Sequence, residues 1–246
     1  MKYFHSFDAI KIITMKKILY LAVFGFCLGA NAQSNDALTK HYEAYYKQMK
    51  AQGDVQGLIN AITHLNVLKP SEARKDTLAY IYLKEGKFNQ ALNTIGAEQK
   101  SSDSEMALEV KAVALKSLGN MEGSIPFFKA IYDKNKNAQV AYELAELNLN
   151  LNKLTEAKNY IDLGLTNVKD NQGKSFYETQ QPYKVSLKSA FYYLDALVQF
   201  NQNKEANKPA ALLLLDKALA IEPQFNMALI AKNALSPQTQ STETKE

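Results

Sequence analysis

The sequence predicts an all-α fold, a superhelical solenoid of about five helical hairpins followed by a C-terminal capping helix. The first observation is that Gly53, Gly86, Gly119 and Asn152 are spaced 33 residues apart. Glycine and asparagine tolerate the left-handed backbone with which a helix ends. The second observation is that apolar residues recur in the same register on both sides of each turn. A fixed period that combines a turn residue with an apolar face is typical of stacked helical hairpins.

Each hairpin can be placed along the chain from this register. We expect repeats near residues 39–71, 72–104, 105–137, 138–169 and 185–223, and a capping helix at 225–235. In the first repeat an i, i+3, i+4, i+7 pattern of Tyr42, Tyr45, Tyr46 and Met49 makes one apolar stripe of a helix. Small residues recur where the two helices of a hairpin approach each other: Ala79, Ala112 and Ala145, with Ala91 and Ala157.

Local signals refine these boundaries. Ser102 and Glu105 have the spacing of a capping box and predict the start of the third repeat. Pro126 is expected near the first turn of a helix, where its missing N–H matters little. Residues 170–183 are polar and contain Gly173 and Pro182, which predicts an inserted loop between the fourth and fifth hairpins.

The first 32 residues have the pattern of an export signal. Lys16 and Lys17 precede an apolar run, Ile18–Leu28, and Ala30-Asn31-Ala32 then predicts cleavage before Gln33. An apolar run of this length is too short for a permanent membrane span, which needs about 20 residues. The alternatives Met1 and Met15 both remain open as the start of translation. The junction resembles export signals of Bacteroidota, which implies a periplasmic protein, with secretion as the alternative.

Removal of this segment leaves a repeat domain at residues 33–235 and a polar tail at 236–246, which we expect to be disordered. The whole chain has a net charge of +4, from 29 basic and 25 acidic residues. Residues 1–32 contain four of the lysines and one of the acids, so the remainder is nearly neutral. This balance disfavours nucleic acid and anionic membranes as partners, because both require clustered cations. Cys27 is the only cysteine and falls within the signal, which excludes disulfides and thiol catalysis in the mature chain.

No motif in the sequence predicts an enzyme. The mature chain contains only His41 and His64, without metal-binding spacing, and there is no nucleophile elbow, phosphate loop or dinucleotide fingerprint. The carboxylates of Glu143 and Glu146 are at helical spacing, which we interpret as a solvated helix face. We therefore expect no catalysis, no cofactor and no metal.

The repeated positions resemble the tetratricopeptide repeat (TPR) family. Its hairpin has a small residue and an aromatic in the first helix, a glycine turn, and then an aromatic, an alanine and another aromatic. Ala79, Tyr82, Gly86, Phe88 and Ala91 follow that order. The resemblance implies that the first helices of the hairpins line a concave groove. The implied lining consists of Glu43, Lys47, Lys50, Asp76, Tyr80, Leu83, Lys84, Glu109, Val113, Lys116, Tyr142, Glu146 and Leu149.

This groove predicts a scaffold that binds a protein or peptide partner in the periplasm and does not span the membrane after cleavage. Glu43, Asp76 and Glu109 would form an acidic row beside a basic row of lysines, although the same charges would also serve solubility and helix-internal pairs. Leu83 and Leu149 would be partly exposed apolar anchors. The alternative is a glycan or cell-wall binding module, in which Tyr80, Tyr142 and Tyr192 would stack on sugars.

Overall fold

The computed structural model describes residues 35–236. The predicted signal at residues 1–32, the cleavage before Gln33 and residues 237–246 of the predicted tail lie outside the described residues. The described part is helical apart from two short strands, so the predicted all-α solenoid class is confirmed. The chain divides into two compact units, Met1–Glu85 and Gly86–Glu246.

The first unit contains a helix over residues 35–52, then α2 (Val55–Leu68) and α3 (Glu72–Lys84). Asp54 caps α2, because its carboxylate accepts a hydrogen bond from the Gly57 backbone N–H at 2.9 Å. The core of the unit is built around three buried apolar side chains, with partly buried aromatic and β-branched residues packed against them. These buried residues are Ile59, Ile62 and Leu78.

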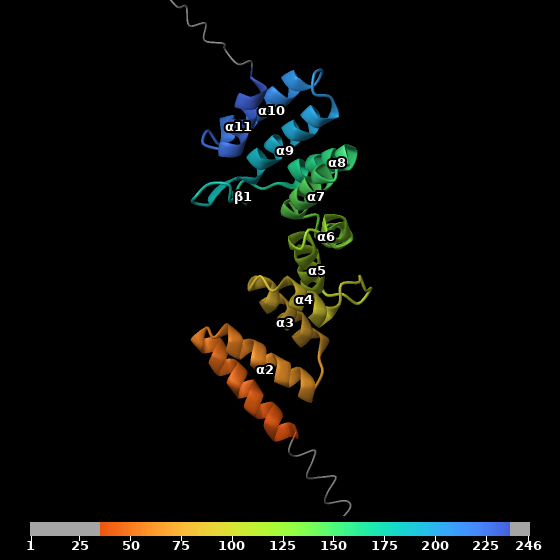
Figure 1. The fold of residues 1–246 in the computed structure, drawn as a ribbon, viewed down its shortest axis with the longest axis vertical. Helices are drawn as coiled ribbons and strands as arrows, with labels where there is room; N and C mark the ends of the chain where they lie inside the picture. The colour runs from red at the N-terminus through yellow and green to blue at the C-terminus, as the bar shows by residue number, and fades with distance from the viewer. Residues whose placement is uncertain (1–34, 237–246) are drawn as a thin grey trace, which may run out of the picture. The chain divides into compact units, whose positions relative to one another are not determined.

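The second unit is a series of helical hairpins (Figure 1). α5 packs on α6, α7 on α8 and α9 on α10, and α6 and α8 contact the first helix of the next pair. The elements are α4 (Phe88–Ile95), α5 (Glu105–Ser117), α6 (Met121–Asn135), α7 (Ala138–Asn150), α8 (Leu154–Asn167), β1 (Gly173–Phe176), β2 (Tyr183–Ser186), α9 (Leu187–Gln202), α10 (Lys208–Ile221) and α11 (Asn226–Leu235).

The periodic turn residues adopt the backbone predicted for them. Gly53, Gly86, Gly119 and Asn152 have φ values of 70°, 68°, 83° and 56°. Of the four, only Asn152 carries a side chain, and asparagine is one of the few residues that tolerate this region. The left-handed turn therefore recurs at the predicted interval and reverses the chain between consecutive helices.

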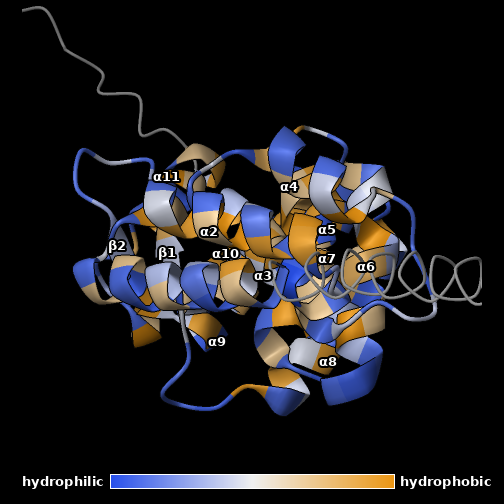
Figure 2. Ribbon diagram, turned by 90° about the horizontal axis from the view of Figure 1, so that it is seen from below, coloured by the Kyte–Doolittle hydropathy of each residue, from blue (hydrophilic) through white to orange (hydrophobic). Residues whose placement is uncertain are grey.

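Small residues and amphipathic faces explain how the helices pack. Ala79, Ala91, Ala112, Ala145 and Ala157 are all fully buried. Within the second unit, α5 packs on α6 and α7 on α8, which agrees with the close contacts predicted at Ala112, Ala145 and Ala157. Hydrophobic and hydrophilic residues alternate along individual helices in Figure 2, as expected when each helix has one face in the core. Within residues 35–236, no helix combines the length and the apolar character that a membrane span requires.

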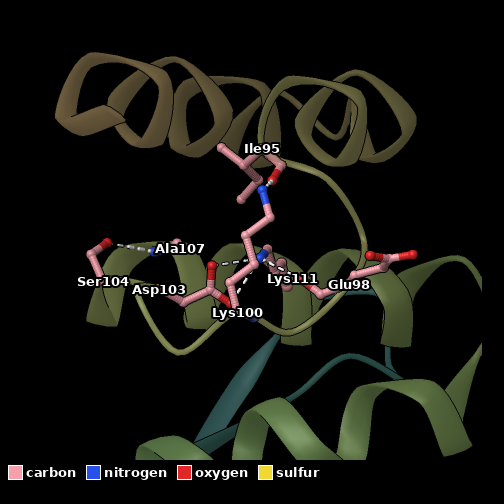
Figure 3. Close-up of polar contacts among 7 residues, drawn as sticks. All are labelled: Ile95, Glu98, Lys100, Asp103, Ser104, Ala107 and Lys111. Carbon is pink, nitrogen blue, oxygen red and sulfur yellow. Dashed lines mark hydrogen bonds and ion pairs between the residues drawn. The ribbon is translucent and has the colours of Figure 1, made fainter. Parts of the chain in front are cut away.

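The connection between α4 and α5 differs from the prediction. Ser104, not Ser102, caps α5, because the Ser104 hydroxyl accepts a hydrogen bond from the Ala107 N–H at 3.0 Å (Figure 3). The same connection contains an ion pair in the protein interior. The Lys111 ammonium donates to both carboxylate oxygens of Asp103, at 2.6 and 2.8 Å, and to the Glu98 carbonyl oxygen at 2.7 Å.

Pro126 lies near the first turn of α6, as expected, but not within it. α6 begins at Met121, so Pro126 falls in the second turn. At this position its missing N–H leaves the Glu122 carbonyl oxygen without its usual helical partner. The expectation that its missing N–H matters little is therefore wrong, because α6 starts directly after Asn120, whose side chain accepts from the Gly123 N–H at 2.9 Å.

The predicted inserted loop at residues 170–183 is in part regular structure, which the sequence analysis did not predict. β1 and β2 form an antiparallel hairpin in which Lys174 faces Val185 and Phe176 faces Tyr183. One face of the hairpin packs on the helices: the Phe176 ring lies 4.9 Å from the Phe225 ring, and Val185 is buried. The hairpin forms because apolar residues alternate along two short segments, and because the neighbouring helices provide a surface that covers them.

Candidate functional site

A cavity of about 680 Å³ is lined by α5 and α7, each the first helix of its hairpin, and by β1. α5 contributes Glu109, Val113 and Lys116, and α7 contributes Tyr142. These four residues all belong to the groove lining that the sequence predicts. The third wall, made by residues Gly173 to Ser175 of the hairpin, was not predicted.

A second cavity of about 310 Å³ lies further along α7. Glu146 and Leu149 of α7 line it, together with Tyr193 of α9 and Phe176 of β1. Leu149 is partly exposed there, as the sequence predicts for an apolar anchor. The β hairpin therefore borders both cavities, and its position decides which parts of α7 remain accessible.

A cluster of ion pairs fixes the hairpin to the first helices. The Lys116 ammonium contacts the Glu143 carboxylate at 2.5 Å and the Glu146 carboxylate at 2.6 Å. Lys174 of β1 contacts the other oxygen of Glu143 at 2.7 Å, and its ammonium lies 4.6 Å from the centre of the Tyr142 ring. About a quarter of the side-chain surface of these charged residues is exposed. Glu143 thus joins α5, α7 and β1.

The electrostatics of the cluster favour the charged forms of Lys116 and Glu143. Burial disfavours the charged form of Lys116, but the carboxylates of Glu143 and Glu146 outweigh it and raise the pKa of Lys116. Burial likewise disfavours the charged form of Glu143, but Lys174 and Lys116 hold its pKa below the ordinary value. Burial, reinforced by the two carboxylates, raises the pKa of Tyr142, so its hydroxyl stays neutral.

The interpretation of Glu143 and Glu146 as a solvated helix face is therefore wrong. Their partners come from a preceding helix and from the insertion, and sequence spacing does not reveal either contact. The structure also contains functional candidates that the sequence analysis missed, namely Gly173, Lys174 and Ser175. The alternation of apolar Phe176, Tyr183 and Val185 was a signal for a hairpin here, but nothing in it indicated where the hairpin packs.

Tyr142 is not available as an exposed aromatic. It is 1% exposed, with the Phe191 ring packed edge-on at 5.4 Å and the Lys174 ammonium over its face. The expected exposed pair of Tyr80 and Tyr142 is thus absent, because Tyr142 points into the contact between helices and hairpin. A ring covered in this way cannot stack on a sugar, and the basis for the glycan-binding alternative is lost.

Leu83 is also placed differently from the prediction. It is 8% exposed and belongs to the core of the first unit. It lies four positions after the buried Ala79, so both side chains lie on the same face of α3. The remaining predicted residues of this unit are partly or fully exposed on its surface: Glu43, Lys47, Lys50, Asp76, Tyr80 and Lys84.

Within residues 35–236, no group of three or more histidine, cysteine, aspartate or glutamate side chains is arranged to hold a metal ion. The site is instead a pair of cavities with apolar and charged walls on consecutive first helices. Such an arrangement can hold a polypeptide segment through shape and charge.

Comparison with known proteins places this geometry in a structural class. No protein-family model matches the chain, and no curated protein matches it. Among solved structures, it is similar to YrrB, described as a TPR protein with an unusual peptide-binding site, with 14% identity and a TM-score of 0.59 over 78% of this chain and 90% of that one. A tetratricopeptide repeat protein from Parabacteroides merdae gives 14% identity and a TM-score of 0.59 over 80% and 72% of the two chains. The MamA protein gives 15% identity and a TM-score of 0.56 over 75% and 92%.

These similarities define the fold as that of a TPR solenoid. At this level of identity the shared property is the arrangement of helical hairpins. The resemblance noted in the repeated positions is thereby confirmed.

Proposed function

We propose that this protein is an exported, non-catalytic TPR scaffold that binds a segment of a partner protein in the periplasm. The observation that supports the proposal most directly is the cavity between α5, α7 and β1, where four predicted groove residues meet. The similarity of the fold to YrrB, a TPR protein with an unusual peptide-binding site, also supports it. The export signal pattern at residues 1–32 supports the periplasmic location.

Site-specific photo-crosslinking in the native organism tests the binding role. A benzophenone amino acid at Val113, which lines the larger cavity, should give a discrete adduct with a partner protein. The matched control carries the same amino acid at Asn159, an exposed position on α8 that lines neither cavity. Equal adducts at both positions, or none at Val113, would contradict a binding role for this cavity.

The export part of the proposal has its own measurement. Mass spectrometry of the protein released from the periplasm should give a chain that begins at Gln33 or at its cyclised form. Recovery of an intact Ile18–Leu28 segment in the membrane fraction would contradict cleavage and leave the binding role to be tested separately.

A further inference from the structure

The β hairpin has two edges with different surroundings. Leu187 N–H donates to the Gln172 carbonyl oxygen at 3.0 Å, which makes Gln172 and Leu187 a hydrogen-bonded pair next to the hairpin. Hydrogen-bonded and non-hydrogen-bonded pairs alternate along an antiparallel ladder. The pairs of Gly173 with Ser186 and of Ser175 with Lys184 are therefore non-hydrogen-bonded, and the backbone groups of these residues point away from the partner strand.

An independent contact supports this assignment. Ser186 N–H donates to the Glu222 carboxylate at 2.9 Å, so it points outward from β2 and not toward β1. The outer edge of β2 is thus occupied at Ser186. The outer edge of β1, by contrast, belongs to Gly173 and Ser175, which line the 680 Å³ cavity.

The charges around that cavity are not balanced. Lys116 and Lys174 are matched by Glu143 and Glu146 in the ion-pair cluster. Two further carboxylates line the cavity, Glu105 and Glu109, and among residues 35–236 no lysine or arginine lies within ion-pair distance of either. Glu105 accepts only a neutral amide hydrogen bond, from Asn135 at 3.3 Å. The cavity therefore attracts a positively charged group.

The cavity also has apolar walls for alternate side chains of an extended chain. Val113 of α5, Phe128 and Ile131 of α6, and Val140 of α7 line it on the side of the helices. A strand lying beside β1 would direct every second side chain toward these residues. The same strand would meet two backbone donors and two backbone acceptors at Gly173 and Ser175.

From these three features we propose that the outer edge of β1 binds an extended, lysine-containing segment of the partner as a third strand of the sheet. This mode of recognition rests on the proposed peptide-binding function and specifies how the segment is held. Backbone hydrogen bonds to Gly173 and Ser175 provide affinity, the apolar wall selects alternate side chains, and Glu105 and Glu109 select positive charge.

The test measures fluorescence anisotropy of a labelled decapeptide of alternating valine and lysine, titrated with the full chain released from the periplasm. Ser175→Pro removes one outward N–H, and proline is tolerated on a strand edge that faces away from the sheet. It should weaken binding about threefold to tenfold, the effect of one hydrogen bond. Glu109→Gln should also weaken binding, and should reduce its dependence on ionic strength.

Lys184→Pro is the matched control. Lys184 forms the same cross-strand pair as Ser175 but belongs to β2 and does not line the cavity. The substitution makes the same backbone change on the opposite edge of the same hairpin, so it should not weaken binding. A glutamate-for-lysine version of the probe should bind at least about tenfold more weakly than the lysine probe, because its charges repel those of the cavity.

Amide hydrogen exchange provides a second readout. Binding should slow exchange of the Gly173 and Ser175 amides, whereas the Lys174 amide, already bonded to β2, should change little. Failure of the lysine probe to bind would overturn the proposal. The proposal would also be overturned if the Ser175→Pro and Lys184→Pro variants bound the probe equally well and binding left the exchange rates of the Gly173 and Ser175 amides unchanged. In either case the Val113 crosslink still reports separately on the scaffold function.

Discussion

The buried pair of Lys111 and Asp103 gives the sharpest prediction of stability. The Lys111 side chain is 0% exposed and that of Asp103 is 7% exposed, and the ammonium has three acceptors within 2.8 Å. Asp103 in addition accepts from the Lys100 backbone N–H at 2.9 Å. Asp103→Asn keeps the shape of this side chain but removes the negative charge, and it leaves a desolvated ammonium with only neutral acceptors.

The expected loss of stability depends on which charges remain buried in each variant. Removing one partner of a buried ion pair costs about 3–5 kcal/mol, and the retained Glu98 carbonyl and asparagine oxygen place Asp103→Asn near 3 kcal/mol. Lys111→Met has a similar length and removes the cation, so the double variant Asp103→Asn/Lys111→Met contains no buried charge. We expect the double variant to lie within about 1 kcal/mol of the parent, since apolar replacements of buried pairs are often neutral.

The measurement is urea denaturation followed by circular dichroism. The parent, both single variants and the double variant together form a double-mutant cycle. The expected coupling between the two sites is at least about 2 kcal/mol. Hydrogen exchange in α5 locates the effect, because Lys111 belongs to that helix. A loss below about 0.5 kcal/mol for Asp103→Asn would mean that water reaches the ammonium, and the reasoning from burial would be refuted.

Three further predictions concern the repeat and the hairpin. Ala145→Leu should destabilise the second unit by about 1–3 kcal/mol, because Ala145 is fully buried and a larger side chain must displace its neighbours; an unchanged thermal melt would show that the contact is loose. Asn152→Val should also lower the melting temperature, because φ is 56° there and a β-branched residue is strained, whereas Asn152→Gly should not. The pKa of Glu143 is lowered, so its stabilisation is complete above the unfolded carboxyl pKa and is lost as the pH falls through the lower folded value. The pKa of Lys116 is raised, so its contribution is present below the unfolded lysine pKa and is lost as the pH rises through the higher folded value. The protection factors of the β1 and β2 amides, which compare their exchange rates with those of an unstructured peptide at the same pH, should therefore be constant between about pH 5 and pH 10 and should fall outside that window. An unchanged protection factor at about pH 3 would contradict the anchoring role of Glu143.

The sequence by itself determined the helical hairpins and their spacing. Gly53, Gly86, Gly119 and Asn152 predict the turns because the left-handed backbone is a local property that few residues tolerate. Ala145 and the other small residues predict close helix contacts because only a small side chain fits there. The lining by Glu109, Val113 and Lys116 was also predictable, through the resemblance of the repeated positions to the TPR family.

Only the tertiary structure decided how the insertion is used. Lys174 and Glu143 are 31 residues apart in the sequence, and no local pattern indicates that β1 packs against α7 beside Tyr142. The same contact buries Tyr142, which the resemblance to the TPR family assigned to the groove lining. Periodicity reports the direction of a side chain from its own helix but not what another segment places over it. Long-range packing therefore determines which segment forms the third wall of the larger cavity. It also determines that the outer edge of β1 faces this cavity.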